Sequence, residues 1–106
     1  MSAKYWQRGE TIDYTATEAV SNGDVVDLAT RIGVAGNDIA ANETGAVHVV
    51  GVFEIPKATG EITLGATVYW DKAAKNITTT SESNTPAGWA VAAAKSGDAT
   101  VLVKLL

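Results

Sequence analysis

Residues 46–55 read AVHVVGVFEI and form the longest run in the chain that favours a β-strand. Valine, isoleucine and phenylalanine suit a pleated surface, because their stiff or bulky side chains pack well against neighbouring strands. Pro56 follows directly and has no amide hydrogen to donate to a ladder. We therefore expect one long strand that ends at Ile55, within a fold built on β-sheet.

The rest of the chain has the same bias, since Val, Ile and Thr together make up 31 of the 106 residues. Turn-forming residues recur at short intervals, as in Ser21-Asn22-Gly23-Asp24, and divide the chain into short strands. We expect the other strands at residues 11–16, 25–29, 31–35, 67–70, 77–80, 89–94 and 99–105. The prediction is an all-β fold of about eight short strands, arranged as a compact small barrel or sandwich, because period-two patterns serve both architectures.

One segment could also be helical. Residues 89–95 contain good helix formers, but Gly88 and Gly97 enclose only about eight residues, which is short for a helix. The strand interpretation is therefore favoured. Trp89 and Phe53 are predicted to lie in the core.

The length of 106 residues fits one domain with a single modest core. Residues 1–10 precede the first clear strand, so we expect an N-terminal arm there and a single β domain over residues 11–106. The start of the chain is polar, and no stretch has the length of apolar residues that a membrane span needs. We expect a soluble protein without a membrane partner, synthesised in the cytoplasm.

The composition argues against several classes of protein. There is no cysteine, which excludes disulfides and thiolate chemistry. The formal net charge is −4 and the eight basic residues are scattered, whereas a nucleic-acid binder concentrates its Lys and Arg residues. We therefore expect no nucleic-acid partner.

Motifs for catalysis or cofactor binding are missing from the sequence. No Gly-x-Ser-x-Gly pentapeptide and no Gly-Lys dipeptide occurs, which argues against a serine hydrolase and a phosphate-binding loop. The single histidine, His48, cannot form a His-based metal site alone. Asp24 and Asp27 would face opposite sides of a strand, and both Asp24 and Asp98 fit turn roles. We expect no enzyme activity, no cofactor and no metal site.

Tyr5, Trp6, Gln7 and Arg8 lie in the predicted arm. Chain termini are commonly disordered unless they are tied down. Two large aromatic residues in such a place either pack against their own domain or dock on a partner. Tyr, Trp and Arg are the residue types enriched at interface hot spots, so these four residues are the candidate contact residues.

Four segments, in the same order along the chain, resemble the capsid cement or head-decoration proteins of tailed bacteriophages, which are sometimes labelled recombinase-like. The segments are GETIDYTA (residues 9–16), GVFEIPKA (51–58), VYWD (68–71) and GDATV (97–101). The resemblance implies a compact β fold that assembles as a homotrimer on the outside of the phage head. It would bind the major capsid protein at local threefold positions and strengthen the shell. If the N-terminal arm adds a strand to the capsid protein, main-chain hydrogen bonds would give affinity and Tyr5 and Trp6 would act as anchors.

A second function remains open at this point. A β module that binds carbohydrate or a host surface, such as a fibre accessory, would present exposed aromatic residues in a shallow groove. Trp70 is the candidate for such a platform, because one residue of the adjacent pair Tyr69 and Trp70 should face the core and the other the outside.

Overall fold

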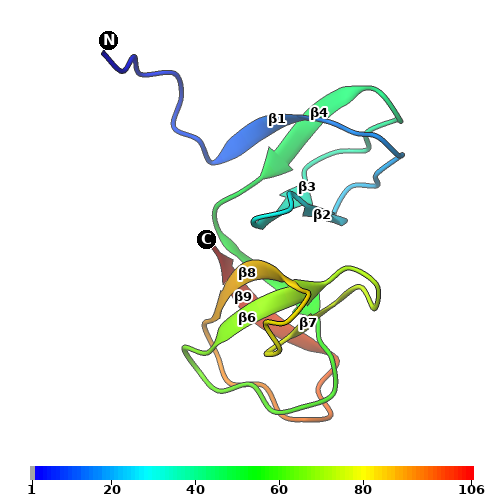
Figure 1. The fold of residues 1–106 in the computed structure, drawn as a ribbon, viewed down its shortest axis with the longest axis vertical. Helices are drawn as coiled ribbons and strands as arrows, with labels where there is room; N and C mark the ends of the chain where they lie inside the picture. The colour runs from blue at the N-terminus through cyan, green and yellow to red at the C-terminus, as the bar shows by residue number, and fades with distance from the viewer. Residues whose placement is uncertain (1) are drawn as a thin grey trace.

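The computed structural model describes residues 2–106, which form nine β-strands in two antiparallel sheets and contain no helix (Figure 1). The predicted all-β class is confirmed, with nine strands in place of about eight. Within the described residues neither sheet closes into a barrel, so the sandwich alternative fits the arrangement. Residues 2–106 also lack any helix that is long and apolar enough to cross a membrane.

The first sheet comes from the N-terminal half of the chain and has the strand order β1-β4-β3-β2. Its strands are β1 (Thr11–Thr15), β2 (Val25–Asp27), β3 (Ile32–Ala35) and β4 (Thr44–His48). The turn predicted at residues 21–24 lies just before β2, where the Asp24 carboxylate accepts a hydrogen bond from the Ser21 amide at 3.0 Å. Asp24 therefore has the turn role expected of it.

The second sheet has the strand order β5-β9-β8-β6-β7. Its strands are β5 (Val52–Pro56), β6 (Thr67–Asp71), β7 (Asn76–Thr78), β8 (Thr85–Ala90) and β9 (Thr100–Leu105). The two edge strands approach each other at one corner, where Lys57 forms an isolated parallel bridge with Ile77. The buried Lys57 Nζ donates hydrogen bonds to the carbonyl oxygens of Ala58, Lys95 and Ser96 at 2.9, 3.1 and 3.3 Å. These bonds satisfy the buried amine and attach the end of β5 to the turn before β9.

Strand β3 contributes to both hydrophobic cores. Its Ile32 and Val34 belong to the main core, which is otherwise formed by residues of the second sheet and its loops, including Ile55, Trp70 and Val103. The smaller core lies in the first sheet and contains Ala16, Val26, Ala35, Ile39 and Val47. The shared strand therefore joins the two sheets into one body.

The prediction of one strand over residues 46–55 is wrong. The chain leaves β4 after His48 and enters β5 at Val52, so the run is divided between the two sheets. Gly51 lies in the crossover with a φ of +128°, a conformation that residues with a side chain rarely adopt. The crossover allows Val47 to pack in the smaller core and Ile55 in the main core.

The strand predicted over residues 89–94 begins four residues earlier, because β8 covers Thr85–Ala90. Pro86 lies outside the part of β8 that pairs with β9, and it is next to an irregularity in the β6–β8 pairing. The amide hydrogen that proline lacks is therefore less important for the sheet at this position. Trp89 is half-buried and outside the core, contrary to the prediction, and its neighbour Ala90 occupies the core position. Phe53 is partly buried and packs against the main core.

Replacing Gly88 with alanine should lower the free energy of unfolding by ~3 kcal/mol or more, measured by urea denaturation. Gly88 has a φ of +148°, and an added Cβ would overlap the carbonyl oxygen of Lys104 on the adjacent strand. Gly97→Ala is the matched control, since a Cβ there meets no atom within 4 Å. Equal unfolding midpoints for the two variants would contradict this account of β8.

Replacing Thr85 with valine should lower the free energy of unfolding by about 1.5 kcal/mol, because a bond to a charged acceptor is lost. The buried Thr85 hydroxyl donates to the Asp27 carboxylate at 2.9 Å and joins β8 to β2 across the two sheets. The control is Thr100→Val. The Thr100 hydroxyl donates to the Glu54 carboxylate at 3.1 Å at an exposed site. Thermal unfolding should show a clear loss for Thr85→Val alone; an equal loss in both variants would show that the contact between the sheets adds nothing.

Candidate functional site

The predicted N-terminal arm projects from the body ahead of β1 (Figure 1). Met1, its first residue, lies outside the described residues, and residues 2–8 are exposed. Two contacts hold the base of the arm. The Gln7 side-chain amide donates to the Thr11 carbonyl oxygen at 3.0 Å, and the Arg8 guanidinium lies 3.1 Å from the Glu10 carboxylate. The ion pair is largely exposed, so it contributes little to stability.

Tyr5 and Trp6 are 80% and 85% exposed. They therefore do not pack against their own domain, which was one of the two possibilities for these residues. Large aromatic side chains bury much apolar area when they contact a partner. Gln7 and Arg8 follow them directly in the sequence and are also exposed, so all four candidate contact residues are accessible on one segment.

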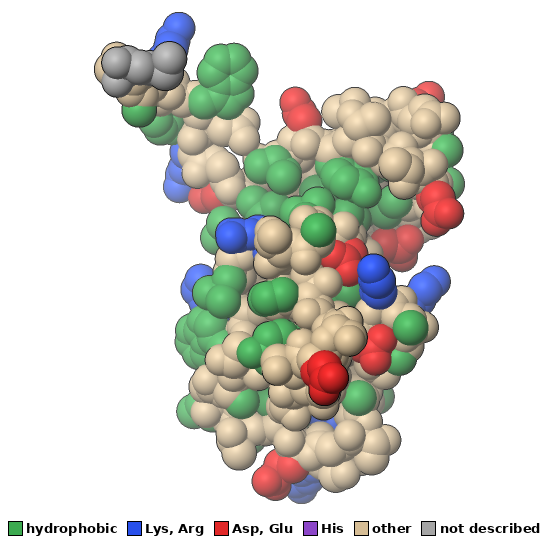
Figure 2. All heavy atoms as spheres, in the orientation of Figure 1, with side chains coloured by type: hydrophobic (Ala, Val, Ile, Leu, Met, Phe, Trp, Pro, Cys, Tyr) green, Lys and Arg blue, Asp and Glu red, His purple; other side chains and the backbone are tan. Residues whose placement is uncertain are grey.

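The charges of the arm and the body have opposite signs. The arm, residues 1–10, contains Lys4, Arg8 and Glu10 and carries +1. Because the whole chain has a formal net charge of −4, residues 11–106 carry −5. Figure 2 shows basic side chains along the arm and several acidic side chains over the first sheet. A partner that binds the arm therefore meets a basic, aromatic segment attached to an acidic body.

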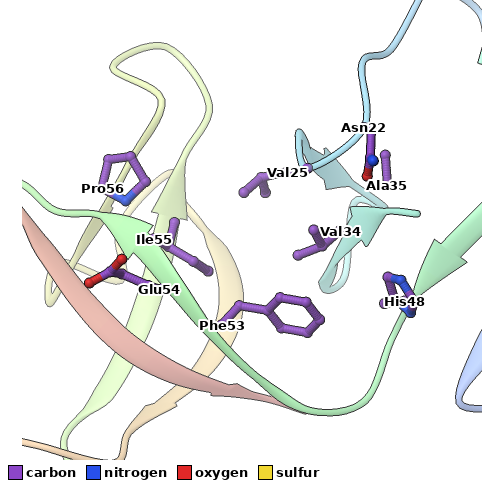
Figure 3. A pocket seen from close by; sticks show the side chains of 10 residues that line it. Asn22, Val25, Val34, Ala35, His48, Phe53, Glu54, Ile55 and Pro56 are labelled. Atoms are coloured by element: carbon purple, nitrogen blue, oxygen red, sulfur yellow. The ribbon is translucent and has the colours of Figure 1, made fainter. Parts of the chain in front are cut away.

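A groove lies between the two sheets (Figure 3). One part of it is a cavity of about 320 Å³, lined by Val25 and Val34 from the first sheet and by Phe53 and Ile55 from the second. Figure 3 shows the Phe53 ring extending from β5 into the space between the sheets. The ring of His48 lies on the far side of Phe53, with a centroid separation of 5.9 Å and an interplanar angle of 36°. This end of the groove is mainly apolar.

The other end of the groove is polar. It is a cavity of about 390 Å³ whose lining includes Asp24, Asp27, Lys72, Lys75 and Trp70. Trp70 is only 7% exposed and belongs to the main core, so the exposed platform considered for a carbohydrate-binding module does not form. The Asp27 carboxylate is engaged in hydrogen bonds within the chain, which gives it a structural role.

Asp98 also has a structural role. Asp98 accepts a hydrogen bond from the Lys95 amide at 2.8 Å, which is the turn role expected from the sequence. Within residues 2–106, no group of three His, Cys, Asp or Glu side chains is placed to hold a metal ion. The groove was not foreseen from the sequence, because its lining residues come together only through the crossover between β4 and β5.

Comparison with known protein families identifies a family for this chain. A family model described as phage cement protein matches residues 6–105. The matched range contains every strand described above and also Trp6, Gln7 and Arg8, while Tyr5 lies one residue outside it. No curated protein and no solved structure matches the chain. Since the match covers nearly the whole sequence, the chain belongs to the phage cement protein family.

Proposed function

We propose that this protein binds the outside of a phage capsid as a homotrimer at local threefold positions and stabilises the head. Membership of the cement family makes it a structural protein associated with the capsid of a phage virion. The finer proposal adds the binding mode: residues 1–10 act as a docking arm, and residues 11–106 fold as one β domain. Tyr5, Trp6, Gln7 and Arg8 contact the major capsid protein.

The exposure of Tyr5 and Trp6 is the observation that carries the proposal. Two exposed aromatic rings on a projecting segment lose no contact with their own domain when they bind, and they bring a large apolar area to the partner. Aromatic anchors of this kind supply much of the binding energy in protein interfaces. Arg8 can add charge-assisted hydrogen bonds to carboxylates of the capsid protein.

Three arms in one trimer would strengthen the attachment. When one arm is bound, the other two search only a small volume, so the overall affinity exceeds that of a single arm. A protein that binds the assembled shell and not its separated subunits stabilises the shell by mass action. The acidic body fits an exterior position, because a formal net charge of −5 outside the arm does not favour contact with packaged DNA.

Deleting residues 2–8 should abolish sedimentation of the protein with undecorated capsids and leave its β-sheet circular dichroism unchanged. Binding should be lost because the deletion removes the four candidate contact residues. The fold should remain because these exposed residues contribute nothing to either core. The single substitution Trp6→Ala should weaken binding by about 30-fold, which corresponds to a hot-spot loss of ~2 kcal/mol.

Leu64→Ala is the matched control for Trp6→Ala. Leu64 is 66% exposed and lies outside the arm, in the turn before β6. This variant should bind capsids as the unchanged protein does. If the deletion variant sediments with capsids to the same extent as the full chain, the arm is not the docking element.

Light scattering after size exclusion should give a mass of about 33 kDa across a dilution series, three times the 11.0 kDa of one chain. A symmetric trimer presents three identical arms, and this mass would show that it forms before the protein meets the shell. A mass of one chain at every concentration would remove a preformed trimer from the proposal and leave only assembly on the shell.

A further inference from the structure

Strand β1 lies at the edge of the first sheet and pairs only with β4. Two hydrogen bonds at its ends fix which main-chain groups face β4. The Val49 amide donates to the Glu10 carbonyl oxygen, and the Ala16 amide donates to the Glu43 carbonyl oxygen, both at 3.0 Å. In an antiparallel ladder the residues that exchange hydrogen bonds alternate with residues that do not. Counting inward from both ends therefore gives the direction of every group in β1.

The residues of β1 fall into two sets that differ in the direction of their main-chain groups. The main-chain groups of Ile12 and Tyr14 face β4, whereas those of Thr11, Asp13 and Thr15 point away from it. The Thr11 carbonyl oxygen is covered by the Gln7 side chain. Among the described residues, the amides and carbonyls of Asp13 and Thr15 have no partner within the protein. The outer edge of β1 is therefore open from Asp13 to Thr15. At its start, the Thr11 carbonyl oxygen is covered by a residue of the arm.

The other sheet edges are shorter or blocked. Strands β2 and β7 have three residues each. Strand β5 ends at Pro56, and the next residue, Lys57, bridges to β7. Strand β1 has five residues, contains no proline and continues directly from the arm. An unprotected edge strand can pair with a strand of another chain, and natural proteins usually protect such edges. Among the four sheet edges, that of β1 is therefore the best placed to receive a further strand.

We propose that the outer edge of β1 binds an extended segment of the capsid protein as an additional β-strand. The proposal rests on the capsid-binding function above and names the surface beside the arm that completes the contact. Main-chain hydrogen bonds to Asp13 and Thr15 supply the affinity, and alternate side chains of the incoming strand supply the specificity. The segment places apolar side chains beside Ile12 and Tyr14, which pack on the smaller core, and a basic side chain beside Asp13.

The acidic residues on this edge argue against a second copy of the chain as the occupant. Two β1 strands paired about a twofold axis through the middle of the strand would place Asp13 opposite Asp13 of the other copy. Like charges directly opposite each other destabilise a strand pair, and Glu10 and Glu43 add further negative charge near the two opposite ends of the β1–β4 pair. A capsid segment with a Lys or Arg at the matching position complements this charge.

The substitution Asp13→Pro tests the proposal, because it removes the outward amide and leaves the hydrogen bonds to β4 in place. Binding to undecorated capsids, measured by co-sedimentation, should weaken at least about tenfold, as expected for one lost main-chain hydrogen bond and the steric bulk of the ring. Asp13→Asn keeps the amide and removes only the exposed charge, so it should weaken binding by no more than about threefold and separates the loss of the charge from the loss of the amide. Circular dichroism and thermal unfolding show whether each variant is folded.

Hydrogen exchange on the unchanged chain tests the same edge without a substitution. On capsid binding, peptides that contain residues 13–15 should exchange at least about tenfold more slowly, because free amides become hydrogen-bonded, while peptides from β6 should not change. Unchanged exchange over residues 13–15, or a folded Asp13→Pro variant that binds capsids normally, would overturn the edge proposal. If the unchanged chain itself does not bind capsids, the proposed function fails first, and the two failures are thereby distinguished.

Discussion

The arrangement of the protein depends on the burial of Ile32 and Val34, two residues of the first sheet, in the core of the second sheet. Each such side chain contributes about 1.5–3 kcal/mol when fully buried, and their strand also supplies Ala35 to the smaller core. The hydrogen bond from Thr85 to Asp27 and the crossover at residues 49–51 support the same junction. Without this junction, the five residues of the smaller core would have to hold the first sheet together alone. The position of β1 and of the arm relative to the second sheet follows from it.

The surface proposed for binding is separate from the groups that hold the fold together. Tyr5 and Trp6 are exposed and touch neither core, and the outward main-chain groups of β1 take no part in the β1–β4 ladder. Changes in the arm can therefore alter binding without altering stability. Changes at the junction between the two sheets alter stability and leave the proposed contact residues in place. This division of roles suits a member of the cement family.

The sequence predicted the fold class because that class depends on residue type: many β-branched residues with frequent turns predict strands. The contact role of the residues YWQR near the terminus stays a prediction from composition, and the structure adds that Tyr5 and Trp6 are exposed. The division of residues 46–55 between two sheets was missed, because a single glycine inside a run that favours a strand does not reveal the crossover until its φ is known. Trp89 was placed in the core because of its size, yet the small neighbour Ala90 occupies that position. The open edge of β1 could not be predicted, because it depends on strand order and hydrogen-bond register.

Electron cryomicroscopy of capsids decorated with the full chain tests the central claim most directly, because it shows which residues touch the shell. The account predicts density for three copies at each local threefold position on the exterior, with Tyr5 and Trp6 in contact with the major capsid protein. Density in which the arm points into solvent while other surfaces of the body touch the shell would contradict it.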